Sequence, residues 1–98
     1  MNTLYLTSDA IALDFDQAKR AADAVAGVLL GENVCMSWYD RILDQEAPAH
    51  VSECHDDSCA VPGYVEYAES RGAELMVDVA GGTFVFCYRP LGEFAQEA

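Results

Sequence analysis

The chain has 98 residues, a length typical of one domain with a single hydrophobic core. Acidic residues outnumber basic residues 17 to 5, and the formal net charge is -12. Such a charge repels nucleic-acid phosphates and anionic lipid headgroups, so we expect no nucleic acid and no membrane as partner. Hydrophobic residues make up 52% of the chain, which argues against a disordered protein.

The first residues, MNTLYLTSDAIALDFD, lack both a basic start and a continuous apolar run. They do not predict a secretory signal, and no apolar stretch in the chain has the length of a membrane span. We therefore expect a cytoplasmic protein. In that compartment its four cysteines, Cys35, Cys54, Cys59 and Cys87, are expected to be reduced thiols.

The first half of the chain predicts a strand, a helix and a second strand. Residues 4–7, LYLT, alternate as a strand does. Apolar residues recur at steps of three and four over residues 15–30, which predicts a helix with Asp14 as N-cap and Gly31 at its end. Residues 33–40, NVCMSWYD, alternate again. This alternation places Val34, Met36 and Trp38 on one face of a strand and Cys35, Ser37 and Tyr39 on the other.

The second half begins with an irregular stretch, residues 41–61, which predicts a long loop. Pro62 and Gly63 then begin a short helix that Gly72 ends. The segments AELMVDVA and TFVFCYR flank Gly81-Gly82, which predicts a hairpin. Its register pairs Leu75 with Tyr88, Val77 with Phe86 and Val79 with Phe84. Residues 90–98 are expected to form a frayed acidic tail.

These elements predict one α+β domain over residues 1–98, in the order βα-β-loop-αββ. The sheet is expected to be mixed and four-stranded, with both helices on one face. The other face would then expose apolar side chains among charged ones, which is unfavourable in water. We therefore expect a homodimer or a protein partner at this face, and we interpret the chain as an interaction module without catalytic activity of its own. The predicted interface residues are Cys35, Met76, Val85 and Cys87.

Several short strings resemble an uncharacterised family of small prokaryotic domains of unknown function. They are SWYD (37–40), SECH (52–55), PGYVEYAESRGAEL (62–75) and VDV (77–79), and the likeness runs from Ile11 to Arg89. The resemblance implies a small α+β fold and a soluble prokaryotic protein. It implies no activity, ligand or catalytic residue.

The densest group of reactive side chains is HVSECHDDSC, residues 50–59. Its His50, Cys54, His55 and Cys59 are residue types that bind zinc at structural sites. The spacing differs from that of zinc fingers, which use two short pairs far apart, and the adjacent Cys54 and His55 do not easily reach one ion. A metal-binding protein that holds zinc or iron in this loop is the alternative to the interaction module. A further interpretation is that residues 50–59 form only a solvated polar loop.

A thiol-based enzyme or redox protein is the third interpretation. A protonated His50 or His55 would lower the pKa of Cys54 or Cys59, whereas three nearby carboxylates would raise it. Because the chain contains no convincing catalytic set, its residues leave open whether the protein is an enzyme.

Overall fold

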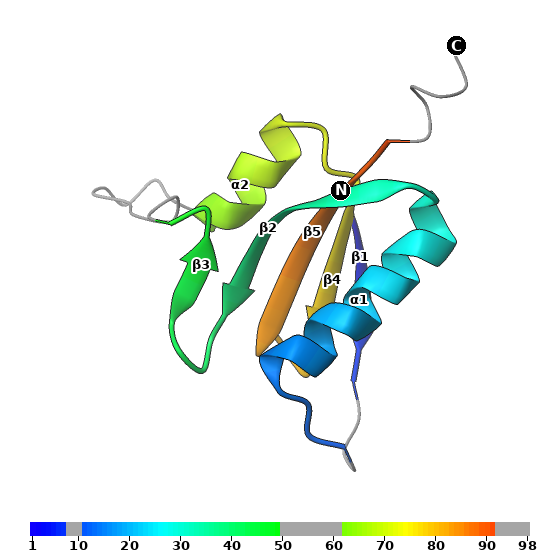
Figure 1. Cartoon of the computed structure of the whole chain (residues 1–98). Helices are drawn as coiled ribbons and strands as arrows, with labels where there is room; N and C mark the ends of the chain where they lie inside the picture. The colour runs from blue at the N-terminus through cyan, green and yellow to red at the C-terminus, as the bar shows by residue number, and fades with distance from the viewer. Residues whose placement is uncertain (8–10, 50–61, 92–98) are drawn as a thin grey trace.

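Five strands and two helices form the parts of the chain that the computed structural model describes, which are residues 1–7, 11–49 and 62–91. The elements are β1 (Asn2–Leu6), α1 (Phe15–Leu30), β2 (Asn33–Asp40), β3 (Gln45–Ala47), α2 (Gly63–Ser70), β4 (Leu75–Val79) and β5 (Phe84–Pro90). The strands form one mixed sheet in the order β1-β4-β5-β2-β3 (Figure 1). The α+β class and the mixed sheet are confirmed, and the number of strands is corrected from four to five.

The fifth strand, β3, lies inside the stretch that was predicted to be a long loop. It pairs antiparallel with the end of β2, so that Gln45 lies opposite Asp40. The buried Asp40 carboxylate accepts hydrogen bonds from the backbone N–H groups of Ile42 at 2.9 Å and Leu43 at 3.2 Å, which stabilises the turn between the strands. The three residues of β3, QEA, lack the apolar alternation that identifies a strand in a sequence.

Helix α1 begins and ends where the sequence predicts. Asp14 Oδ1 accepts a hydrogen bond from the Gln17 N–H at 2.8 Å, and Gln17 Oε1 accepts one from the Asp14 N–H at 3.0 Å. This capping box satisfies backbone donors that the first helical turn leaves unpaired. Gly31 follows the helix with a φ of 72°, in the region that favours glycine. One face of the helix buries three small residues, Ala18, Ala22 and Ala26.

The hairpin of β4 and β5 has the predicted register, with Leu75 opposite Tyr88, Val77 opposite Phe86 and Val79 opposite Phe84. Its turn has positive φ angles at both Gly81 and Gly82, as a type I′ turn requires.

The two helices lie on opposite faces of the sheet, which corrects the prediction that they share one face. Along β5, the side chains of Phe84, Phe86 and Tyr88 belong to the cluster that contains the buried alanines of α1. The alternating Val85 and Cys87 belong to a second cluster, with Tyr64 and Ala68 of α2. All five side chains from Phe84 to Tyr88 are buried. A strand that buries both of its faces needs a covering layer on each.

A β-bulge in β2 changes which side chains share a face. Cys35 lies opposite Tyr88 and Ser37 lies opposite Cys87, so Met36 is the extra residue. Cys35 and Trp38 therefore pack on the α1 side, while Met36 and Tyr39 pack on the α2 side. The regular alternation predicted for this strand fails at the bulge.

The connection through α1 leaves β1 at the edge of the sheet. β1 and β2 run in the same direction but are not neighbours: β1 pairs with β4, and β2 pairs with β5 and β3. No described strand lies beyond β1 or beyond β3. Within the described residues, the sheet therefore has two edge strands, β1 and β3.

We expect Asp14→Ala to lower the free energy of unfolding by about 1 kcal/mol, because it removes the acceptor that caps α1. Asp14→Asn is the matched control, because asparagine is an equally good N-cap, and its effect should be a few tenths of a kcal/mol at most. Urea unfolding followed by circular dichroism measures both. Equal losses in the two variants would contradict a stabilising role for this cap.

Candidate functional site

The predicted metal ligands His50, Cys54, His55 and Cys59 lie outside the described residues, so zinc or iron binding in this loop stays a prediction. Within residues 1–7, 11–49 and 62–91, no three His, Cys, Asp or Glu side chains are grouped so that they could hold a metal ion.

The four predicted interface residues do not form one surface. Val85 and Cys87 are buried under α2, and Met76 is half-buried beside them. Cys35 packs on the opposite side of the sheet, against the α1 core. The apolar face expected to bind a partner is therefore covered, at Val85 and Cys87, by a helix of the same chain.

The two described cysteines are free thiols with raised pKa values. Burial raises the pKa of Cys87 to about 11, and burial is also the largest cause of the raised pKa of Cys35. Both side chains are therefore neutral near pH 7, whereas a cysteine nucleophile or metal ligand must be a thiolate.

A polar network joins α1 to β5. The Tyr88 hydroxyl donates a 2.7 Å hydrogen bond to Asp23, and Lys19 Nζ donates to both carboxylate oxygens of Asp23 at 2.8 and 2.9 Å. Burial is the largest cause of the raised pKa of Tyr88, and the bond to Asp23 raises it further. The Tyr88 ring is buried, and the only polar atom of its side chain is hydrogen-bonded. The network therefore explains how this tyrosine is accommodated in the core, and it indicates no reaction at Tyr88.

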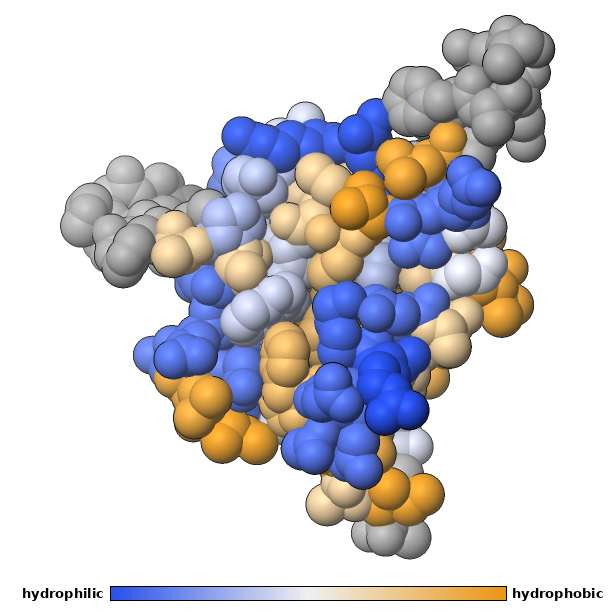
Figure 2. Space-filling model, in the orientation of Figure 1, coloured by the Kyte–Doolittle hydropathy of each residue, from blue (hydrophilic) through white to orange (hydrophobic). Residues whose placement is uncertain are grey.

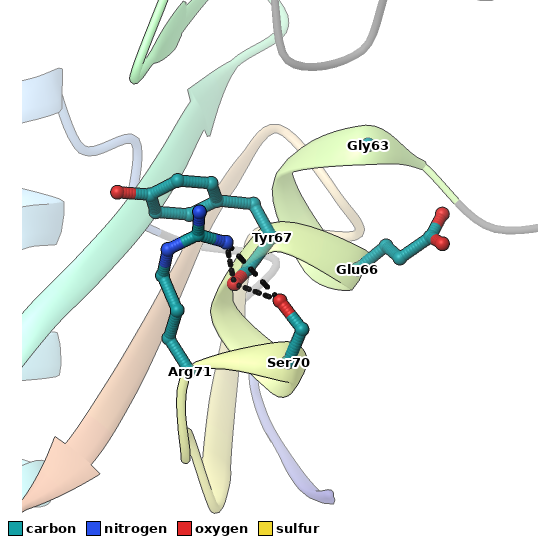
Figure 3. A pocket seen from close by; sticks show the side chains of 5 residues that line it. All are labelled: Gly63, Glu66, Tyr67, Ser70 and Arg71. Atoms are coloured by element: carbon teal, nitrogen blue, oxygen red, sulfur yellow. Dashed lines mark hydrogen bonds between the residues drawn. The ribbon is translucent and has the colours of Figure 1, made fainter.

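An open hollow of about 300 Å³ lies along α2 (Figure 3). The Arg71 guanidinium stacks over the Tyr67 ring, 3.9 Å from its centroid, and Nη1 donates to the Tyr67 carbonyl and to Ser70 Oγ. The Arg71 guanidinium, which is the group that could bind an anion here, is thus already in contact with groups of α2. All the lining residues come from α2 and the position after it, so the hollow is a surface feature of one helix: Gly63, Glu66, Tyr67, Ser70 and Arg71.

The edge strand β1 is the strongest candidate for a binding site. The Asn2 N–H donates to the Glu74 carbonyl, and the Leu6 carbonyl accepts from the Ala80 N–H, so Asn2 and Leu6 direct these groups toward β4. In a parallel ladder, successive residues of a strand direct their N–H and C=O groups to opposite sides of that strand, so the residues between Asn2 and Leu6 alternate in this respect. Thr3 and Tyr5 therefore present N–H and C=O groups at the outer edge of the sheet.

Strand β1 also lacks the features that normally prevent pairing at an edge. Its sequence, NTLYL, has no charged residue and no proline, and its ladder with β4 is regular. The Tyr5 side chain is 66% exposed. The opposite edge differs: β3 has three residues, carries Glu46, and is followed by Pro48, which has no N–H. Of the two edges, β1 is the one open to an added strand.

An apolar flank of α1 faces the side of the sheet on which β1 lies. Asp23 contacts β5 through Tyr88, which places the polar flank of the helix toward β2 and β5. With about 100° of rotation per residue, Ala21, Val25 and Val28 lie on the opposite flank, toward β1. Val28 is 83% exposed, and residues 24–31 contain no polar side chain.

The C-terminal half of α1 extends toward the β1 side of the sheet. In the view of Figure 1, α1 crosses the sheet diagonally and its C-terminal half reaches beyond β1. Figure 2 shows apolar residues in orange around this part of the helix. We call Ala21, Val25 and Val28 the apolar flank.

Sequence patterns alone do not predict the edge site, because they leave the order of the strands in the sheet open. The signal that points to it is a strand of five residues without a charge, in a chain whose net charge is -12. Whether such a strand is central or at an edge depends on sheet order, which local patterns do not determine.

Fold and site together define a small α+β domain with a helix on each face of a mixed sheet and, within residues 1–7, 11–49 and 62–91, no strand beyond β1. The chain belongs to the family described as domain of unknown function DUF5619, whose model matches residues 1–88. The predicted resemblance to an uncharacterised family is thereby confirmed.

The fold is also similar to the crystal structure of the protein AF1514 from Archeoglobus fulgidus DSM 4304, with a TM-score of 0.70 and 23% sequence identity. That comparison covers 93% of this chain and 95% of the other. None of the curated proteins matches the chain. In the described residues, neither helix has both the length and the hydropathy to cross a membrane.

The buried titratable groups predict that the fold loses stability in alkali. In the unfolded chain Cys87 ionises near its ordinary pKa of 9.0, but in the fold its pKa is about 11. The stability that the neutral thiol contributes is thus complete below pH 9 and is lost as the pH rises toward 11. Tyr64, with a pKa raised from 10.0 to about 12, extends the loss above pH 10.

Urea unfolding at pH 8 and pH 11 measures this loss, and Cys87→Ala should reduce the difference between the two values. An unfolding free energy that stays constant or rises between pH 8 and pH 11 would contradict the raised pKa values of Cys87 and Tyr64 in the fold.

Proposed function

We propose that this domain is a protein-interaction module that binds an extended protein segment by adding a strand to β1. The observation that carries the proposal is the set of outward-facing N–H and C=O groups of Thr3 and Tyr5 on an uncharged edge strand. In this mode main-chain hydrogen bonds supply the affinity, and the side chains beside the edge supply the specificity.

The surroundings of β1 support the same function. A strand added at this edge would direct alternate side chains to the two faces of the sheet. On the α1 face those side chains would meet Leu4 and the apolar flank, which removes apolar surface from water. On the other face they would meet the exposed Tyr5 ring, and aromatic residues of this kind are common at the centre of protein interfaces.

Lack of charge on β1 matters because the domain as a whole is strongly acidic. A charged side chain on an edge strand opposes pairing with another chain, and acidic residues are abundant elsewhere in this sequence. Their absence from all five positions of β1 leaves the main-chain groups free to pair. The proposed setting is the cytoplasm, in which Cys35 and Cys87 would stay free thiols.

Photo-crosslinking in the cells that naturally make the protein tests this function. We expect p-benzoylphenylalanine at Tyr5 to form covalent adducts with protein upon irradiation. We expect the adducts to disappear with Thr3→Pro, since proline lacks the outward N–H, and to persist with Thr3→Val, which keeps it.

The same photo-reactive residue at Ile42 is the matched control, because Ile42 is 69% exposed but lies in the turn between β2 and β3. Adducts that are no more frequent from position 5 than from position 42, or that persist in Thr3→Pro, would contradict binding at β1.

A further inference from the structure

The identity of the segment that pairs with β1 follows from the strand itself. Resting on the proposed function, we infer that the segment is β1 of a second copy of this chain, paired antiparallel about a two-fold axis that passes beside Leu4. The two sheets then become one continuous sheet. Thr3 of each copy lies opposite Tyr5 of the other, and the two Leu4 residues face each other.

The hydrogen-bonding pattern of β1 is complementary to itself in this register. We call the boundary between the two paired β1 strands the seam. An antiparallel ladder forms its hydrogen bonds between residues that both direct their N–H and C=O groups across this boundary. Thr3 and Tyr5 do so and Leu4 does not, so pairing Thr3 with Tyr5 of the second copy uses every outward-facing group of both residues. A shift by one residue would place outward groups opposite inward ones and would form no ladder.

The side chains are compatible with the same arrangement. A two-fold axis perpendicular to the sheet keeps each face on its own side, so the α1 helices of both copies lie on one face of the continuous sheet. Leu4, which packs toward the α1 core, then meets its equivalent below the two apolar flanks. Tyr5 meets Thr3 on the other face. No charged residue of β1 lies at the seam.

Net charge sets a distinctive condition on this assembly. Each copy carries a formal charge of -12, so two copies repel each other through the surfaces around the seam. Because salt screens this repulsion while leaving the apolar contacts and main-chain hydrogen bonds in place, added sodium chloride should strengthen the dimer. An assembly held by salt bridges would respond in the opposite direction.

Sedimentation equilibrium of the purified full chain tests the inference. We expect a mass of twice 10.6 kDa at high protein concentration, with a dissociation constant that falls as sodium chloride is added. Thr3→Pro should reduce the mass to that of one chain, and Val28→Lys should do the same by placing a charge on the apolar flank. Thr3→Val and Ile42→Lys, which change the edge side chain and a remote exposed residue, should leave the dimer intact.

Circular dichroism and thermal unfolding verify that each variant is folded. The β1–β4 ladder should survive Thr3→Pro because the N–H that is lost faces away from β4. A wild-type chain that stays monomeric at millimolar concentration in high salt would overturn the inference, as would a dimer that both Thr3→Pro and Val28→Lys leave intact.

The two proposals fail in distinguishable ways. If the purified chain is monomeric but Tyr5 crosslinks to other proteins in a manner that Thr3→Pro abolishes, self-pairing is overturned and strand addition at β1 stands. If neither self-association nor Thr3-dependent crosslinking occurs, both are overturned.

Discussion

Burial of β5 on both faces is the constraint on which the rest of this structure depends. Its five side chains from Phe84 to Tyr88 alternate between the α1 core and the α2 core, and each set is shielded from water by a helix. β5 pairs with β4 on one side and with β2 on the other, and these pairings determine the positions of both strands in the sheet. The bulge at Met36 serves the same end, because it lets β2 place Cys35 and Trp38 against α1 and Tyr39 against α2. Covering both faces leaves the edges as the sites at which the sheet of the described residues can still form main-chain bonds, and of the two edge strands β1 contains neither a charged residue nor a proline.

The proposed binding site therefore lies at the edge of the sheet and not on its face. A partner at the face would have to displace α2, which buries Tyr64 and Ala68 against Val85 and Cys87. A partner at the edge would displace no element of the described residues, because Thr3 and Tyr5 are exposed and their main-chain groups point outward. Raised pKa values of Cys35 and Cys87 fit a structural role for these thiols in the two cores. The network of Lys19, Asp23 and Tyr88 likewise satisfies a buried hydroxyl.

Local signals in the sequence predict local structure well here. The capping box at Asp14, the stop at Gly31 and the Gly81-Gly82 turn each depend on a few adjacent residues, and the structure confirms all three. The predictions that were wrong depend on contacts between residues that are distant in the sequence. The uninterrupted apolar run FVFCY is typical of a strand buried on both faces, whereas the predicted placement of both helices on one face leaves the other face of this strand open. The bulge at Met36 and the short strand β3 leave no pattern in the sequence, and the edge position of β1 follows from sheet order alone.

Amide hydrogen exchange of β1, followed by nuclear magnetic resonance, tests most directly whether its outer edge pairs with a second copy. The Leu4 and Leu6 amides, which by strand parity face β4, provide an internal reference that should be protected at every protein concentration. The account predicts that the Thr3 and Tyr5 amides are also protected in concentrated samples and exchange rapidly once the sample is diluted. Rapid exchange of Thr3 and Tyr5 at all concentrations, beside protected Leu4 and Leu6, would contradict it.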